Sequence, residues 1–297
     1  MVRYSNFSYR FAAYFKFLCL CLLFLPVVLK GQERRQVVDI NNLSSIDTAV
    51  LAGIEAGELP GAVVLVTHRG ETIYRKAFGH RAVRPLAEPM TVDTIFDLAS
   101  LTKVIATAPS VMALVEEGLI RLRDPVSLYV PGFEQYGKGA VTIEHLLTHV
   151  SGLRPDFPLE QEFEGTEIAV QRATEELLEA SPGERFIYSD INFLLLGAIV
   201  EQVSGQSLVE FSRRKIFAPL GMTETFFHPP AMFRDRIAPT EACGRLAWPC
   251  GGPGAEMLRG TVHDPTARRM GGVSGHAGLF GTADDLARFG AMVLGGG

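Results

Sequence analysis

A serine and a lysine three residues apart open a long apolar stretch of this chain. Ser100 and Lys103 follow an extended run at residues 94–99, and the apolar segment after them predicts a helix to about Glu117. Residues at this spacing lie on one face of a helix, so the two side chains can reach each other. A lysine amine placed in this way can take the proton of a serine hydroxyl and make its oxygen a nucleophile. The pair therefore predicts acyl transfer through Ser100.

The same spacing occurs a second time, at Ser212 and Lys215. That serine lies in the middle of an amphipathic segment, residues 208–217, whose charges fall on the solvent face. We expect Ser212 to be structural and Lys215 to be solvated. Ser100 differs because its flanks are apolar and its helix begins at the serine. Backbone N–H groups at a helix start favour developing negative charge and disfavour a protonated amine.

A second chemical element, Tyr188-Ser189-Asp190, comes directly before an apolar helix predicted over residues 190–203. A tyrosine at a loop-to-helix junction can point its phenol into a cleft. A nearby lysine would lower the pKa of that phenol, so Tyr188 could act as a general base. The alternative is a half-buried tyrosine with a satisfied hydroxyl and an aspartate that only caps the helix. Taken without Ser100, the segment favours this structural alternative.

The composition fits one large globular domain or two small ones, with 47% hydrophobic and 21% charged residues in 297. The first thirty residues differ, because three basic residues precede an apolar run at 17–29. Residues 1–31 are therefore predicted to be a secretory signal peptide, with an uncleaved membrane tether through 17–29 as the alternative. Either form predicts a periplasmic or secreted protein.

Charge and cysteine content limit the partners of the remaining chain. Residues 1–31 hold four basic and no acidic residues, so the rest has 24 Lys and Arg against 33 Asp and Glu, a formal net charge of −9. This balance argues against nucleic acid as a partner. Cys243 and Cys250 could form a small disulfide in an oxidising compartment or remain two free thiols. No cluster of residues has convincing metal-ligand spacing, and no cofactor is predicted.

The remaining pattern mixes helices and strands. Residues 43–56 predict an amphipathic helix, and residues 62–68 and 72–78 predict an antiparallel hairpin around a turn at 69–71. A helix over 142–149 has Thr142 as its predicted cap. Residues 154–172 are polar, and we expect them to form an irregular loop over a site.

Several motifs together resemble one known family. In chain order they are residues 96–103, His145-Leu146-Leu147-Thr148-His149 with Ser151-Gly152-Leu153, residues 182–190, Pro219-Leu220-Gly221-Met222, Val262-His263-Asp264 and residues 271–280. This set resembles the serine β-lactamase-related family, which includes class C β-lactamases, DD-peptidases and esterases. The last two blocks are similar to the periplasmic penicillin-binding DD-carboxypeptidase branch. The resemblance covers about residues 40–297.

The resemblance implies a fold and roles for four residues. The fold class is α+β, a three-layer α/β/α arrangement with an antiparallel central sheet and a helical subdomain, here spanning residues 38–297. Ser100 matches the acylated serine, and Lys103 matches the partner that accepts or relays its proton. Tyr188 matches the tyrosine that protonates the leaving group and activates the deacylating water. Asp190 stands at a substrate-orienting position that is usually Asn in class C enzymes, and an ionised aspartate cannot donate a hydrogen bond but can hold Lys103 charged.

The family's third motif is the main departure. His276-Ala277-Gly278 superficially fits it, but residues 282–289 read as a capped helix start. We therefore expect His276 to be a loop histidine packed near the site. We further expect the sequence to be incomplete at its C-terminus, with the third motif beyond it, and residues 32–297 alone to be poorly stable and inactive.

The function implied by the resemblance is that of a serine acyl-enzyme hydrolase acting on D-alanyl-D-alanine peptides of peptidoglycan. An esterase or a weak β-lactamase with the same residues is a close alternative. The presence of Asp190 and the missing third motif keep a different class open, a non-catalytic penicillin- or wall-binding protein.

Overall fold

This computed structural model describes residues 39–242 and 257–297, in which strands β1 to β4 follow one another and a mostly helical region comes after them. The predicted signal or tether, together with Cys243 and Cys250, lies outside the described residues. The strands are β1 (Gly61–His68), β2 (Glu71–Ala82), β3 (Glu88–Pro89), β4 (Phe96–Asp97) and β5 (Phe280–Gly281). The α-helices are α2 (Ser44–Glu55), α3 (Ala108–Glu116), α4 (Ile143–Leu147), α5 (Thr166–Glu175), α6 (Asp190–Ser204), α7 (Leu208–Ser212), α8 (Pro265–Arg269) and α9 (Ala283–Gly295). Short 3-10 or π-helical segments are η1 (Ile40–Leu43), η2 (Lys103–Thr107), η3 (Val126–Leu128), η4 (Gln135–Ala140), η5 (Arg213–Phe217) and η6 (Ala231–Arg236).

The predicted hairpin is present as the antiparallel pair β1–β2. Its turn uses Arg69 and Gly70, both with positive φ (54° and 83°), a conformation that glycine adopts without steric cost. The second strand runs on to Ala82, further than predicted, and pairs there with β3 to give the sheet order β1-β2-β3.

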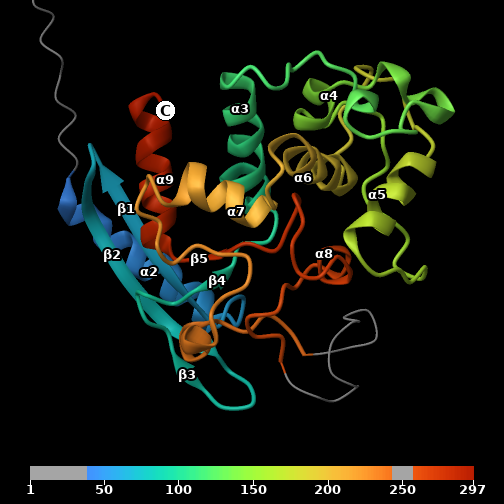
Figure 1. The fold of residues 1–297 in the computed structure, drawn as a ribbon. Coiled ribbons are helices and arrows are strands. Elements are labelled where there is room, and N and C mark those ends of the chain that lie inside the picture. Colours follow the sequence, from blue (N-terminus) through green and yellow to red (C-terminus); the bar gives the residue numbers. More distant parts are fainter. Residues whose placement is uncertain (1–38, 243–256) are drawn as a thin grey trace, which may run out of the picture. The chain divides into compact units, whose positions relative to one another are not determined.

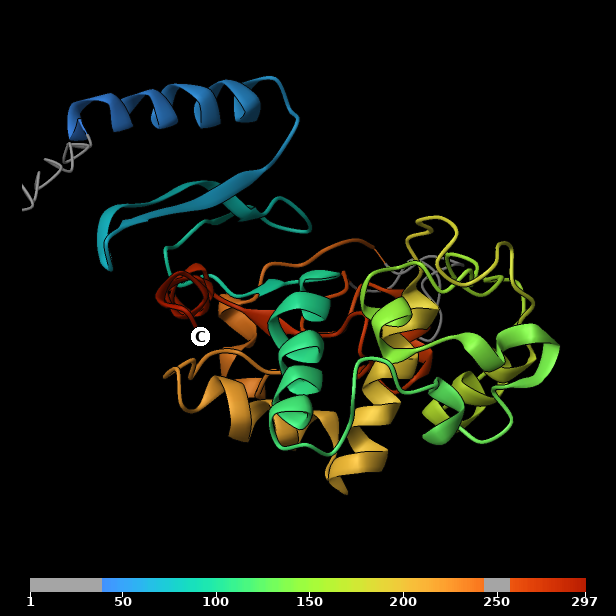
Figure 2. The same ribbon diagram turned by 90° about the horizontal axis from the view of Figure 1, so that it is seen from above.

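Helices cover both faces of this hairpin, as Figures 1 and 2 show for α2 and α9. Successive side chains of a strand point to opposite faces. Arg75 of β2 therefore reaches Asp284 of α9 at 2.6 Å, and its neighbour Lys76 reaches Asp47 of α2 at 2.6 Å. The predicted mixed α+β class, with an antiparallel sheet between helices, is confirmed.

A second, two-stranded sheet connects distant parts of the chain. Phe96 of β4 pairs with Gly281 of β5, and Asp97 pairs with Phe280. This pairing fixes the segment before β5 against the turn that follows β4. The start of the Ser100 helix lies in that turn.

The Ser100 helix has an irregular first half. The chain is helical from Leu101, passes through the π-helical segment η2 and continues as α3. Pro109 lies in the first turn of α3, where its missing N–H is tolerated. The π-helical segment η2 thus lies shortly before Pro109, and π turns are frequent at functional sites.

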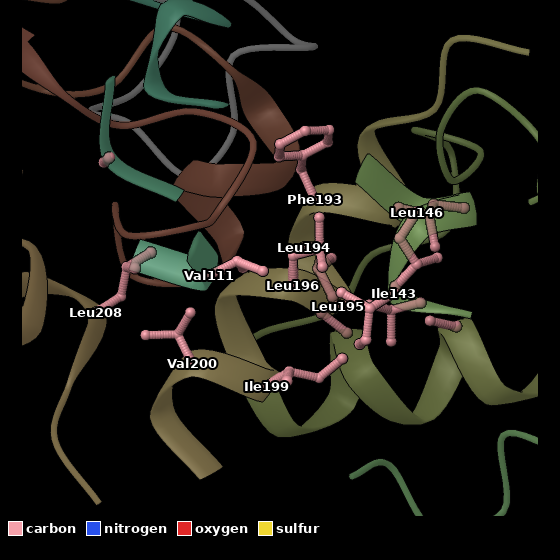
Figure 3. Packing of buried hydrophobic residues seen from close by; sticks show 14 of the residues in the cluster. Val111, Ile143, Leu146, Phe193, Leu194, Leu195, Leu196, Ile199, Val200 and Leu208 are labelled. Atoms are coloured by element: carbon pink, nitrogen blue, oxygen red, sulfur yellow. The ribbon is translucent and has the colours of Figure 1, made fainter. Parts of the chain in front are cut away.

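The core is built around α6, which contacts α3, α4, α5 and α7. Figure 3 shows this packing, with labelled residues of α3, α4 and α7 set against the helix. The labelled side chains that surround α6 and are fully or almost fully buried are Val111, Ile143, Leu146 and Leu208. Residues of α6 are buried on every side, which holds its N-terminal residue, Asp190, in a fixed place.

The loop predicted over residues 154–172 is partly helical. Residues 154–172 were expected to be irregular throughout, but α5 begins at Thr166, so the prediction is wrong for its last residues. Only two small alanines, Ala169 and Ala173, are buried in α5, and this gives too weak an apolar pattern to reveal a helix.

The second serine–lysine pair is structural, as predicted. Ser212 is buried, and its hydroxyl donates to the backbone oxygen of Leu208 at 2.7 Å. Lys215 forms an ion pair with Glu117 of the preceding helical region. The two side chains therefore have separate partners.

Candidate active site

The predicted nucleophile and its lysine lie side by side. The Nζ atom of Lys103 donates to the Ser100 Oγ at 3.0 Å. Ser100 is exposed, whereas Lys103 is only 3% exposed. A buried amine beside an accessible hydroxyl is the arrangement needed to activate a serine for attack on an external acyl group.

The turn before Ser100 has a strained backbone. Ala99 has φ of 44°, a value that residues with a Cβ rarely adopt. Asp97 holds this turn, because one of its carboxylate oxygens accepts the Ala99 N–H at 2.9 Å and the other accepts the His263 N–H at 2.7 Å. Burial nevertheless raises the pKa of Asp97 above its ordinary value, against those two hydrogen bonds. Strain of this kind clusters at functional sites.

Asp190, at the start of α6, meets the same lysine. Its Oδ1 lies 2.6 Å from Lys103 Nζ. The contact is an ion pair, without the alignment of a hydrogen bond. The backbone N–H of Asp190 donates to the Pro155 oxygen at 2.7 Å and fixes the position of the carboxylate. Two of the predicted site residues, Ser100 and Asp190, thus contact the amine of a third, Lys103.

Tyr188, the fourth predicted residue, lies over the same lysine. The Lys103 Nζ is 5.0 Å from the centre of the Tyr188 ring, within the range of a cation–π contact. The tyrosine is 45% exposed, so part of this residue faces solvent. Its role as a general base remains a prediction.

A site residue that the sequence analysis did not single out is His149. Its ring centre lies 4.5 Å from that of Tyr188, and its Nδ1 accepts the Ser189 N–H at 3.1 Å. Burial, and then the charge of Lys103, lower the pKa of His149, in keeping with an unprotonated Nδ1. The histidine belongs to the quoted residues 145–153, and its position in that motif was the available signal.

The block at residues 274–279 reaches the site through its backbone. Lys103 Nζ donates to the His276 oxygen at 3.0 Å, and the Thr107 hydroxyl donates to the Gly275 oxygen at 2.7 Å. The Leu279 N–H donates to the Thr102 hydroxyl at 3.1 Å. The expectation of a loop histidine packed near the site is confirmed, and the helix start that argued against a third motif is α9, capped by Thr282.

The described residues contain neither a cluster of metal ligands nor a membrane-spanning helix. In residues 39–242 and 257–297, no three His, Cys, Asp or Glu side chains come together as a metal site. Within the same residues, no helix has both the length and the apolar character needed to cross a bilayer.

Known proteins resemble this chain in sequence and in fold. A family model described as Beta-lactamase matches residues 46–297. A protein of Escherichia coli (strain K12) named "Putative D-alanyl-D-alanine carboxypeptidase" is 32% identical, over 92% of this chain and 68% of that protein.

Two solved structures share the fold. The octameric penicillin-binding protein homologue from Pyrococcus abyssi superposes with a TM-score of 0.71 at 28% identity, over 86% of this chain and 56% of that one. This chain thus spans little more than half the length of the Pyrococcus protein. A class C β-lactamase from Rhodobacter sphaeroides superposes with a TM-score of 0.66 at 25% identity, over 86% of this chain and 66% of that one. With the family model matching most of its length, the chain belongs to the β-lactamase family.

Proposed function

We propose that the chain is a serine acyl-enzyme hydrolase that removes the terminal D-alanine from D-alanyl-D-alanine peptides of peptidoglycan. The observation that carries the proposal is the 3.0 Å contact between the buried Lys103 amine and the accessible Ser100 hydroxyl. The name of the Escherichia coli relative supports this choice of substrate class.

The reaction would proceed in two steps that share one serine. Ser100 Oγ attacks the carbonyl carbon of the penultimate D-alanine, and its proton passes to the Lys103 amine. The backbone N–H of Ser100 would stabilise the developing oxyanion. The departing D-alanine amine takes a proton through Tyr188, and an ester to Ser100 remains.

Water completes the cycle. Tyr188 takes a proton from the attacking water, whose oxygen bonds to the acyl carbon, and the ester bond to Ser100 breaks. The serine oxygen recovers its proton from the Lys103 side. Acid and base roles are thus exchanged between the two steps.

Asp190 distinguishes the proposed peptidase from a strong β-lactamase. An ionised carboxylate 2.6 Å from Lys103 cannot donate a hydrogen bond to a β-lactam substrate as an asparagine amide would. This favours a peptidase over a strong β-lactamase. The same feature keeps an esterase, and a non-catalytic penicillin- or wall-binding protein, as the alternatives to be tested.

A direct experiment compares two substrates. The chain is incubated with an acylated D-alanyl-D-alanine peptide, and released D-alanine is measured; in parallel, penicillin turnover is followed. The peptidase proposal expects D-alanine release and penicillin trapping, both lost in S100A and both kept in S212A; this result would overturn the expectation that residues 32–297 alone are inactive. Rapid penicillin turnover would favour a β-lactamase, and ester cleavage alone would favour an esterase. Binding without either reaction would favour a non-catalytic protein.

We also propose that the chain acts outside the cytoplasm, because its substrate would be the cell wall and residues 1–31 resemble an export signal. Fractionation of cells that express the chain tests this placement. A purely cytoplasmic protein would contradict it.

A further inference from the structure

We propose that His276 and Asp264 form a buried ion pair that positions Lys103 and reduces the negative charge around it. The proposal rests on the role of Lys103 in the proposed function. His276 would be a positioning residue, since its side chain does not touch the nucleophile. Asp264 at the start of α8 and His276 in the loop before β5 would then both influence the position and the charge environment of Lys103.

The geometry of the pair is complete on both sides of the imidazole ring. His276 Nε2 lies 2.9 Å from Asp264 Oδ1, and Nδ1 lies 2.7 Å from the Ser274 hydroxyl. His276 is 1% exposed, so water does not compete for these contacts. A ring protonated on both nitrogens would donate to both partners.

The electrostatics of the pair favour its charged form. Burial lowers the pKa of His276, but the charge of Asp264 and its hydrogen bond outweigh burial, and the pKa is raised. Burial likewise acts to raise the pKa of Asp264, but His276 and the hydrogen bond from the Ala267 N–H bring it down to about 2. Each partner thus stabilises the ionised form of the other.

His276 is tied to Lys103 through the backbone. The oxygen of the same residue accepts the Lys103 ammonium at 3.0 Å. The preceding Gly275 packs against α6 so closely that a Cβ there would lie 2.0 Å from the Phe193 oxygen. The loop therefore has little freedom, and the side-chain pair and the lysine contact share one rigid frame.

Several charged groups face this pair from other elements. Those that act on His276 are Asp264 before α8, Asp190 at the start of α6 and Lys103 of η2, and the charge of His276 in turn acts on Asp156 in the loop before α5. Lys103 also acts on Asp264, so the two are within electrostatic reach. Asp97 and Arg268 also feel the charge of Asp264, and His263 acts on Asp97.

The pair has a chemical consequence for the lysine. Asp190 already favours the protonated amine, and a protonated amine cannot accept the Ser100 proton. An unpaired Asp264 would add a second nearby carboxylate and hold that proton more tightly. With His276 protonated, the two charges nearly cancel, and Lys103 faces one carboxylate in place of two.

The test measures the lysine directly, without turnover. The chain is labelled with ¹³C at lysine Cε, the Lys103 signal is assigned by its loss in K103M, and its titration is followed by NMR. In H276Q the pKa of Lys103 should rise measurably, because the positive charge of the imidazolium is lost while the Asp264 carboxylate stays. In H276Q/D264N, which removes both charges, it should return to within about 0.3 unit of wild type. An unchanged pKa in H276Q, or a double variant that does not return, would overturn the proposal.

A second measurement does not depend on how H276Q folds. The His276 ring is titrated by NMR in the wild-type chain and in D264N. Its pKa should lie above the ordinary value of 6.5 in wild type and below that value in D264N. A wild-type value at or below 6.5 would overturn the ion pair. Penicillin acylation of Ser100 is measured on the same samples, so that its absence would count against the proposed function and leave the ion pair to be judged by the titrations.

Discussion

The Nζ atom of Lys103 donates a hydrogen bond to the backbone oxygen of His276, 173 positions away in sequence, at 3.0 Å. The contact joins the helix start that carries Ser100 to the loop before β5. The amine of Lys103 therefore has three contacts from three parts of the chain. They are the Ser100 hydroxyl, the His276 oxygen and the Asp190 carboxylate at the start of α6. Disturbing any of the three should affect the same lysine.

Removing the carboxylate of Asp190 should destabilise the protein. Lys103 is 3% exposed, and D190A leaves its ammonium without its charged partner. Because the Asp190 side chain is 22% exposed, we expect a loss of about 2 kcal/mol in the free energy of unfolding, below the range for a fully buried pair. Urea denaturation at neutral pH measures it.

The control for this prediction is the double variant K103M/D190A, which removes both charges. Its loss of stability should be smaller than the sum of the losses in K103M and D190A. Each single variant already loses the whole interaction between the two side chains, so adding the two losses counts that interaction twice. Additive losses would show that the two side chains do not interact.

The loop that carries His276 should not accept a side chain at Gly275. A Cβ there would lie 2.0 Å from the Phe193 oxygen, so G275A must move the loop or α6. We expect a loss of about 1–3 kcal/mol in the free energy of unfolding, together with a lower rate of Ser100 acylation. Gly290 in α9 is a matched control, because nothing lies within 4 Å of its Cβ position. G290A should be neutral or stabilising by up to about 1 kcal/mol, and equal losses in both variants would refute the close-packing argument.

The stability gained from His276 should depend on pH in a defined direction. Its pKa is raised in the folded state, so its contribution is complete below the unfolded value of about 6.5 and is lost as the pH rises through the folded pKa. Asp264 is lowered from 3.8 to about 2, so its contribution is present above 3.8 and is lost as the pH falls toward 2. The stability difference between wild type and H276Q should therefore be largest between about pH 4 and 6.5.

Chemical denaturation of both proteins across pH 2 to 9 checks this dependence. A difference that is constant over the whole range would mean that His276 contributes packing only. A difference that grows above pH 7 would contradict the raised pKa of the imidazole.

Much of the site follows from local sequence, because local interactions produce it. The hairpin around Gly70, the Thr142 cap and the Ser100–Lys103 spacing each depend on neighbouring residues. The cap is present with the Thr142 hydroxyl accepting the His145 N–H at 3.3 Å. Asp190 could be placed beside Lys103 only through the resemblance, since the contact spans two separate helices.

The remaining features depend on tertiary packing. Asp264 and His276 are twelve residues apart, with α8 and a glycine-rich loop between them, and no periodicity marks their contact. Helix α5 was missed because burying two alanines leaves a weak apolar pattern.

The measurement that tests the central claim most directly is the intact mass of the chain after incubation with a penicillin, followed by peptide mapping. Our account predicts one covalent adduct of the mass of the penicillin, located on Ser100, lost in S100A and kept in S212A, where the second serine–lysine pair is removed. An adduct that persists in S100A, or a folded wild-type chain that forms none, would contradict the assignment of Ser100 as the nucleophile activated by Lys103.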